Sequence, residues 1–163
     1  MTRLPFFPEA WLYEPPDWPS LWRLAEGQAG FFTTTEARSK GIRRALLSYH
    51  TGRGTFERAG HGPYRLARWP PEPEDRIRIA WMTAGRELAV VSHESALFIH
   101  GLIDEPPAWV DLTVPRERRR RIPSREVQWG RRVLVHAPRR GLAAGEVTVA
   151  RGIRAEAAER ALV

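Results

Sequence analysis

The residues of this sequence that could do chemistry as a group are arginines, and they are concentrated between Phe31 and Arg68. That stretch contains eight basic residues against two acids, Glu36 and Glu57, so it holds +6 of the chain's formal net charge of +7. Guanidinium groups displace the counterions of DNA phosphates, and a basic surface concentrated on a short segment is typical of a nucleic-acid-binding protein. The charge therefore favours nucleic acid as the partner of this segment.

The sequence around these arginines predicts two short helices that support a third. Asp17 offers an N-cap to a first helix over 20–28. Thr33 and Glu36 have the spacing of a capping box, which predicts a second helix that runs through Lys40.

A third, basic helix is expected after the turn at Gly41, from about Arg43 or Arg44 to His50. A helix of two turns after a glycine turn is the recognition element of a helix-turn-helix. The residues that we expect on its inward face are Ile42, Ala45, Leu46 and Tyr49.

Two short extended runs follow, over 55–58 and 64–67, joined by Gly60-His61-Gly62-Pro63. Their alternation predicts a hairpin wing, with Arg58 and Arg65 facing solvent or phosphate. The side chains expected to face inward are Phe56, Tyr64 and Leu66.

The succession of helix, capped helix, glycine turn, basic helix and basic hairpin predicts a winged helix-turn-helix that binds DNA. The alternative is a winged helix used for protein contacts. The predicted DNA contacts are Thr34, Arg38, Arg43, Arg44, Ser48, His50, Arg53, Arg58 and Arg65. Among them we expect four on the major groove, namely Arg43, Arg44, Ser48 and His50, and three on phosphates or in a minor groove, namely Arg53, Arg58 and Arg65.

The proline-rich segment over 69–73 predicts a domain boundary. Three parts follow from it: an aromatic and proline-rich arm over 1–16, a winged helix-turn-helix over 17–69, and a small mixed α/β domain over 74–163. The arm is interpreted as an ordered or mobile leader, or as an apolar strap that docks on a partner or a second copy. The fold class is α+β.

The second domain should alternate helices and strands. We expect Ser92 to cap a helix that Gly101 closes. The expected elements are helices over 72–83 and 93–100 and strands over 88–91, 109–114, 126–129, 133–135 and 146–149.

The second domain carries few candidates for catalysis or metal binding. Ser92, His93 and Glu94 contain the side chains of a hydrolase triad, but consecutive helical residues point about 100° apart and cannot align. His93 and His100 lie two helical turns apart, about 10 Å, which is too far to bind one metal. With no cysteine to supply thiolates, we expect no enzyme, no metal site and no cofactor.

A second basic feature follows Pro115. As a loop between strands it predicts a solvated turn, or alternatively a second contact with DNA, RNA or an acidic protein surface. The residues of this candidate contact are Arg118, Arg119, Arg120 and Arg121, which Arg131 and Arg132 would extend.

The chain resembles a known family, the AbiEi-like antitoxins of type IV toxin-antitoxin systems, from Leu21 to about Pro115. In the winged helix the resemblance rests on residues 29–34, 37–38, 41, 46–50, 56–58 and 62–66. Beyond it, the resemblance rests on Ser92-His93-Glu94-Ser95-Ala96-Leu97, His100-Gly101-Leu102 and Asp111-Leu112-Thr113-Val114-Pro115.

The resemblance implies an N-terminal winged helix that binds the operon's own promoter. It also implies a C-terminal domain that opposes a nucleotidyltransferase toxin without forming a stable complex with it. One residue and one segment depart from the family's pattern. Arg43 stands where members often carry a capping Ser or Asp, which weakens the start of the third helix by about 1 kcal/mol. After Ile153 the run over 154–162 replaces the continuation typical of the family, so we expect a truncated C-terminal domain.

The leading hypothesis is an autorepressor and antitoxin of the AbiEi-like group that occludes its own promoter, on inverted repeats and as a homodimer. The runner-up is a stand-alone winged-helix regulator whose second domain binds a ligand or a protein. A nucleic-acid-processing enzyme is the third, disfavoured because Asp104, Glu105 and Asp111 are spread over a loop and a strand. The sequence shows neither a long apolar run nor a signal sequence, so we expect a cytoplasmic protein.

Overall fold

The computed structural model describes residues 15–122, 126–127 and 131–162, so the predicted arm lies almost entirely outside the described residues. The chain divides into two compact units. One takes in the chain up to Glu57 together with Tyr64–Trp69, and the other takes in Arg58–Pro63 together with Pro70–Val163. The break after Trp69 coincides with the proline-rich segment, but the tip of the hairpin is grouped with the second unit and not with the winged helix.

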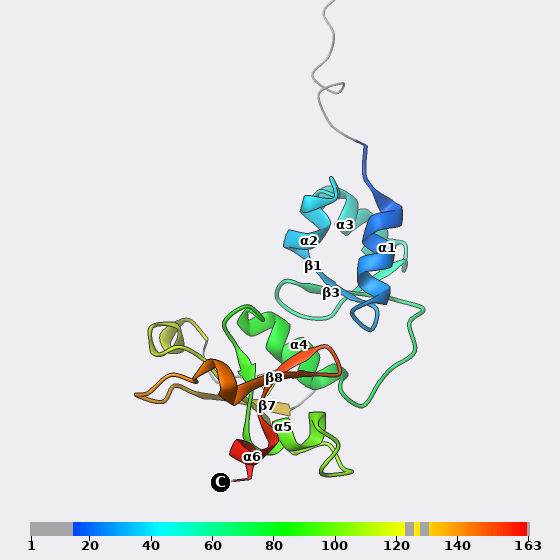
Figure 1. The fold of residues 1–163 in the computed structure, drawn as a ribbon. Helices are drawn as coiled ribbons and strands as arrows, with labels where there is room; N and C mark the ends of the chain where they lie inside the picture. The colour runs from blue at the N-terminus through cyan, green and yellow to red at the C-terminus, as the bar shows by residue number, and fades with distance from the viewer. Residues whose placement is uncertain (1–14, 123–125, 128–130, 163) are drawn as a thin grey trace, which may run out of the picture. The chain divides into compact units, whose positions relative to one another are not determined.

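The N-terminal part of the chain is a winged helix-turn-helix, as predicted, and the α+β fold class is confirmed (Figure 1). Its three strands form a small sheet in the order β1-β3-β2. Its elements are α1 (Trp18–Glu26), β1 (Phe31–Thr33), α2 (Thr34–Ser39), α3 (Arg44–Gly52), β2 (Phe56–Arg58) and β3 (Pro63–Leu66).

The first two helices begin at the predicted caps. The Asp17 carboxylate accepts a hydrogen bond from the Ser20 N–H at 3.0 Å, and hydrogen bonding with the Ser20 side chain, together with this N–H bond, holds the pKa of Asp17 below its usual value. At α2 the capping box is complete: Thr33 Oγ1 accepts from the Glu36 N–H at 3.2 Å, and Glu36 Oε2 accepts from the Thr33 N–H at 2.8 Å.

One apolar core holds the winged helix together, and it draws on all three helices and the hairpin. Around it pack the half-buried side chains of Trp18, Leu24, Leu46, Tyr64 and Trp69. The buried members of the core are Leu21, Ala25, Phe32, Ala37, Ile42, Leu47, Phe56 and Leu66.

The second unit is built on a mixed six-stranded sheet in the order β6-β7-β5-β4-β9-β8. Its helices are α4 (Asp75–Ala84), α5 (His93–Ile99) and α6 (Ala158–Ala161), with 3-10 helices over Arg116–Arg121 (η2) and Ala144–Glu146 (η3). Its strands are β4 (Val90–Val91), β5 (Val110–Thr113), β6 (Glu126–Val127), β7 (Arg131–His136), β8 (Val147–Ala150) and β9 (Ile153–Glu156).

The register of β5 and β7 gives this sheet one apolar and one polar face. In the parallel pair, Val110 lies opposite Val133, while Asp111 lies opposite Leu134 and Thr113 opposite His136. Because successive side chains point to opposite faces, the buried valines share one face and the side chains of Asp111, Thr113 and His136 share the other.

Several predicted elements of the second unit need correction. Helix α4 begins at Asp75 and not at residue 72, because Pro73 interrupts the chain before it. Of the strand expected over 88–91, only Val90 and Val91 form strand hydrogen bonds, and Leu88 is exposed. Of the strand expected over 126–129, residues 128–129 lie outside the described residues.

The segment expected to depart from the family's pattern forms part of the sheet. Arg151 and Gly152 both have positive φ, at 50° and 72°, as the two central residues of a tight hairpin turn do. Strand β9 follows and lies between β8 and β4, with Ile153 and Ala155 fully buried.

We predict that Gly30→Ala destabilises the winged helix by about 3 kcal/mol or more, because an added Cβ would lie 2.4 Å from Cγ of Trp69 at a φ of +82°. Gly54→Ala is the matched control: its φ is +72°, but no heavy atom lies within 4 Å, so only about 1 kcal/mol is expected. Urea denaturation measures both losses. Equal losses for the two variants would show that the Trp69 contact does not matter.

Candidate nucleic-acid interface

Helix α3 presents a continuous outward face. Leu47 is its only fully buried residue, and Ile42, just before the helix, is buried beside it in the core. The exposed residues occupy positions that lie together on one side of a helix, namely Arg44, Ala45, Ser48, Tyr49 and Gly52.

The predicted rotation of α3 was wrong. Ala45 and Tyr49 were expected inside but are exposed, whereas Leu47, expected outside, is fully buried. Only Ile42 and Leu46 lie inward as predicted, Leu46 being half-buried. The error arose because the helix carries apolar side chains on more than one side, so periodicity alone could not choose between them.

Tyr49 is the residue of this face that the sequence reasoning missed. Its side chain is 58% exposed, and the Arg53 guanidinium lies 5.9 Å from the centre of its ring, within range of a cation-π contact. An exposed aromatic ring next to a cation offers both an apolar and a charged contact to a base or a phosphate.

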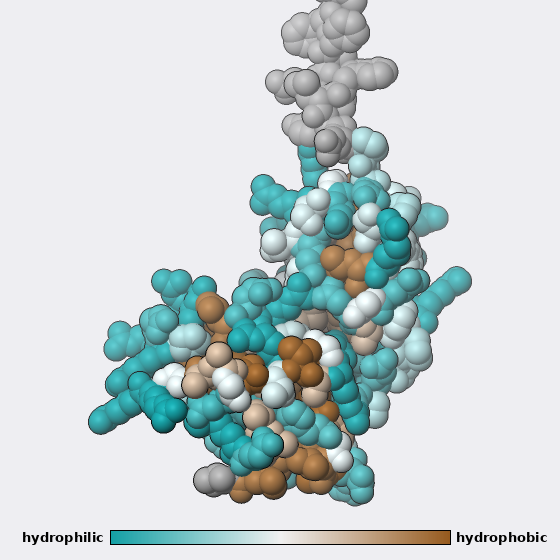
Figure 2. All heavy atoms as spheres, in the orientation of Figure 1, coloured by the Kyte–Doolittle hydropathy of each residue, from teal (hydrophilic) through white to brown (hydrophobic). Residues whose placement is uncertain are grey.

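Three of the predicted contacts are exposed arginines on α2 and at the two ends of α3. Arg38, Arg44 and Arg53 are exposed, and among the residues that the structure describes none of the three forms an ion pair with a carboxylate. Hydrophilic side chains cover most of the visible surface of this unit (Figure 2). These guanidinium groups therefore keep their charge available to an anionic partner.

The start of α3 lacks a side-chain cap. Arg43 occupies the N-cap position in an extended conformation, is exposed, and makes no capping hydrogen bond. Ser48 is exposed one turn further along, and Thr34 is half-buried at the start of α2. The structure thus places Arg43 and Ser48 outward, as predicted.

His50 is a packing residue. Its ring meets that of Trp18 edge to face with centroids 4.7 Å apart, and lies 5.6 Å from the ring of Phe56. The imidazole is half-buried against the aromatic side of the core. This differs from the predicted role of His50 in a DNA groove.

Arg65 is also used internally. Its guanidinium donates to the carbonyl of Trp69 and lies 5.7 Å from the ring centre of Phe31, and the residue is half-buried. Arg58 is exposed as predicted, with its Nε donating to the carbonyl of Gly60 at 3.3 Å. Of the two wing arginines, Arg58 is thus the one placed to meet phosphate.

The arginine run after Pro115 is not a loop but the 3-10 helix η2. Arg118, Arg120 and Arg121 are exposed, and Arg119 is half-buried and donates to the carbonyl of Ile122 at 3.4 Å. Contact of this run with an anionic partner stays a prediction.

The fold, with exposed arginines at both ends of α3, is that of a winged helix-turn-helix. Residues 21–67 match the family described as "Transcriptional regulator, AbiEi antitoxin", which confirms the resemblance over the winged helix. The chain matches none of the curated proteins with which it was compared. Among the described residues, no helix combines the length and the apolar character needed to cross a membrane.

We predict that Tyr49→Ala weakens specific DNA binding about tenfold while the free energy of unfolding changes by less than about 0.5 kcal/mol, because the exposed ring contributes little to the core. Fluorescence anisotropy and urea denaturation measure the two quantities. Leu47→Ala, on the opposite face, should instead lower stability by about 2–5 kcal/mol. Unchanged affinity in the Tyr49 variant would remove this residue from the interface.

Proposed function

We propose that this protein is a DNA-binding autorepressor and antitoxin of an AbiEi-like type IV toxin-antitoxin system. The observation that carries the proposal is the outward face of α3, with the exposed Arg43, Arg44 and Arg53 at its two ends, within the segment that matches the AbiEi family. The description of that family names transcriptional regulation. Binding to the chain's own operator and neutralisation of a toxin are parts of our proposal.

In the proposed complex α3 enters the major groove. Arg44, Ser48 and Tyr49 lie on its outward face and would meet base edges, while Arg38, Arg53 and Arg58 neutralise phosphates. Repression by occlusion needs no catalytic step, and we propose none. The protein acts in the cytoplasm on double-stranded DNA upstream of its own reading frame.

A homodimer on inverted repeats fits this mode of binding. A single short recognition helix contacts few base pairs, so two copies on half-sites about one helical turn apart provide the specificity that one copy lacks. We propose this arrangement for the operator of this protein.

The antitoxin activity is assigned to the second unit. On this proposal the second unit opposes a nucleotidyltransferase toxin without forming a stable complex with it, as the family resemblance implies. The alternative is a stand-alone winged-helix regulator whose second unit binds a ligand. A pocket of about 830 Å³ beside the polar face of the six-stranded sheet favours this alternative.

We predict that Arg44→Ala lowers affinity for the chain's own upstream DNA about tenfold, because an exposed guanidinium on the outward face of α3 is lost. Gel shift at several salt concentrations measures it. Arg23→Ala is the matched control, since Arg23 is an exposed arginine on α1 of the same unit, and it should bind as the unchanged chain does.

Equal weakening by the two substitutions would mean that net charge and not α3 governs binding, and would contradict the proposed orientation. The same titration of the Arg119→Ala, Arg120→Ala double variant decides whether η2 lies in the DNA footprint. An unchanged slope of log K against log salt excludes it.

We predict that co-expression of the chain restores growth of cells that produce a nucleotidyltransferase encoded beside it, and that Arg44→Ala restores growth equally, because neutralisation is assigned to the second unit. Colony counts under induction measure the rescue, and the toxin should not co-purify. Persistent growth arrest with intact DNA binding would favour the stand-alone regulator.

A further inference from the structure

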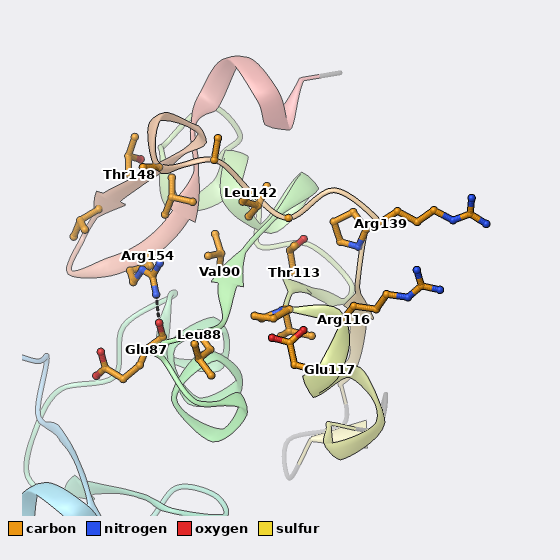
Figure 3. Close-up of a pocket in the computed structure, with 18 residues that line it drawn as sticks. Glu87, Leu88, Val90, Thr113, Arg116, Glu117, Arg139, Leu142, Thr148 and Arg154 are labelled. Atoms are coloured by element: carbon orange, nitrogen blue, oxygen red, sulfur yellow. Dashed lines mark hydrogen bonds between the residues drawn. The ribbon is translucent and has the colours of Figure 1, made fainter.

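The polar face of the six-stranded sheet is hollowed on both sides of Thr113, which lines two pockets. One pocket lies over Val90 and Leu142 (Figure 3). There Arg154 donates to the carbonyl of Glu87, while Arg116 and Arg139 extend away from the pocket floor, so its charged side chains do not converge. The other pocket is lined by His93, His136 and Glu156, and its polar groups do converge.

Two imidazoles and a carboxylate meet at that second pocket. His93, Asp111 and His136 each offer a ligand atom, and these atoms all lie within 4.8 Å of one another. Nε2 of His136 lies 2.8 Å from Oδ1 of Asp111, and the rings of His93 and His136 stack with centroids 4.2 Å apart. Both histidines line the pocket, so a cation held between them would be accessible from it.

The sheet places two of these side chains together. Asp111 on β5 and His136 on β7 lie on the same face of the sheet. Thr113 is opposite His136, and Asp111 lies two residues before Thr113 on the same strand, so all three side chains point to one side. Asp111 is buried, and its backbone N–H donates to Ser95 Oγ at 3.0 Å. Helix α5 therefore holds the backbone of Asp111 in place.

His93 reaches the cluster through an unusual backbone conformation. It is the first residue of α5 and has a φ of +50°, in the left-handed region that residues other than glycine adopt at a cost of about 1 kcal/mol or more. Ser92 occupies the predicted N-cap position of α5, but its side chain makes no capping hydrogen bond. The His93 N–H donates instead to Glu156 Oε2 at 3.2 Å. Strained backbone held by a buried carboxylate is a feature of functional sites.

Carboxylates surround this cluster in a chain that is otherwise strongly basic. Glu146, Glu156 and Glu159 line the pocket with His93 and His136, and among the lining residues Arg160 is the one cation other than histidine. Arg160 pairs with Glu146 at 2.7 Å and lies 3.5 Å from Glu156. Together with Asp111, these groups make the surroundings of the two imidazoles attractive to a cation.

We propose that His93, Asp111 and His136 bind a divalent transition-metal ion of the zinc type. Two imidazole nitrogens and one carboxylate oxygen are a common protein ligand set for such ions, and a site with three protein ligands leaves a coordination position for water or another ligand. Here that position would face the pocket.

The distances suit this ion. Zinc bound at about 2.0–2.1 Å by tetrahedral ligands separates the ligand atoms by about 3.3 Å. The present separations run from 2.8 Å between His136 and Asp111 up to at most 4.8 Å, so the separation required by bound zinc lies within the range of the cluster. Glu156 would then hold the His93 backbone from outside the coordination shell.

The site can be tested on tag-free, full-length protein. We expect one equivalent of Zn²⁺ to bind, measured by competition with a chromogenic chelator, and Co²⁺ to give the visible absorption of a nitrogen- and oxygen-ligated ion. His93→Asn should weaken Zn²⁺ binding at least about tenfold while the metal-free protein keeps its melting temperature, because His93 is exposed and asparagine tolerates its positive φ.

His136→Gln should have the same effect on Zn²⁺ affinity. His61→Asn is the matched control: His61 is exposed on the hairpin tip and lies outside the cluster, so Zn²⁺ affinity and the Co²⁺ spectrum should not change. Wild-type binding no tighter than that of the His93 and His136 variants would overturn the proposal. The His136–Asp111 contact would then be a structural hydrogen bond only.

Discussion

The orientation of the candidate DNA interface depends on the burial of Leu47. Its side chain is fully excluded from solvent in the core formed with Leu21 and Phe56, and this contact fixes the rotation of α3 about its own axis. Once Leu47 faces inward, Tyr49 must face outward, since side chains two residues apart point about 200° apart around a helix, and the exposed Arg44 and Ser48 lie on the outward side with it. A charged residue has no such anchoring power, because a solvated guanidinium gains little from any one position. The apolar core therefore decides where the positive charge points.

The two units use opposite electrostatic designs. In the winged helix, the exposed Arg38, Arg44 and Arg53 form no ion pair with a carboxylate among the described residues, whereas the polar face of the six-stranded sheet gathers Asp111, Glu156 and two histidines in and beside one pocket. The buried Arg78 of α4 shows how the second unit treats a cation inside it. Burial lowers the pKa of Arg78, and Glu72 and the carbonyl of Arg151 compensate the charge. A cation therefore suits the pocket beside these carboxylates, and an anion suits the exposed arginines of the winged helix.

Local chemistry made much of the winged helix predictable. The caps at Asp17 and Thr33 and the turn at Gly41 depend on neighbouring residues, so their order in the sequence was sufficient. The rotation of α3 was not predictable, since Leu47 and Tyr49 are both apolar and only the packing chooses between them. The internal roles of His50 and Arg65 likewise depend on partners that lie elsewhere in the chain.

The second unit was harder to predict because its important contacts are distant in sequence. Strand β9 alternates apolar and charged residues over Ile153–Glu156, a signal that the alanines and glutamates after it obscured. The cluster of His93 with Asp111 and His136 joins α5, β5 and β7, whose arrangement no spacing rule reveals. Considering His93 only with His100, on its own helix, missed both true neighbours.

The start of α3 breaks a rule of helix stability in a way that fits the proposed function. Arg43 provides no cap, and positive side chains at residues 43 and 44 face the positive end of the helix dipole, an arrangement that costs about 1 kcal/mol or more in isolation. The helix forms because Ile42 and Leu47 are buried. A DNA phosphate near this end would accept from the uncapped N–H groups and neutralise both arginines. The same residues that weaken the free helix would then strengthen the complex, so local stability is lowered where binding requires charge.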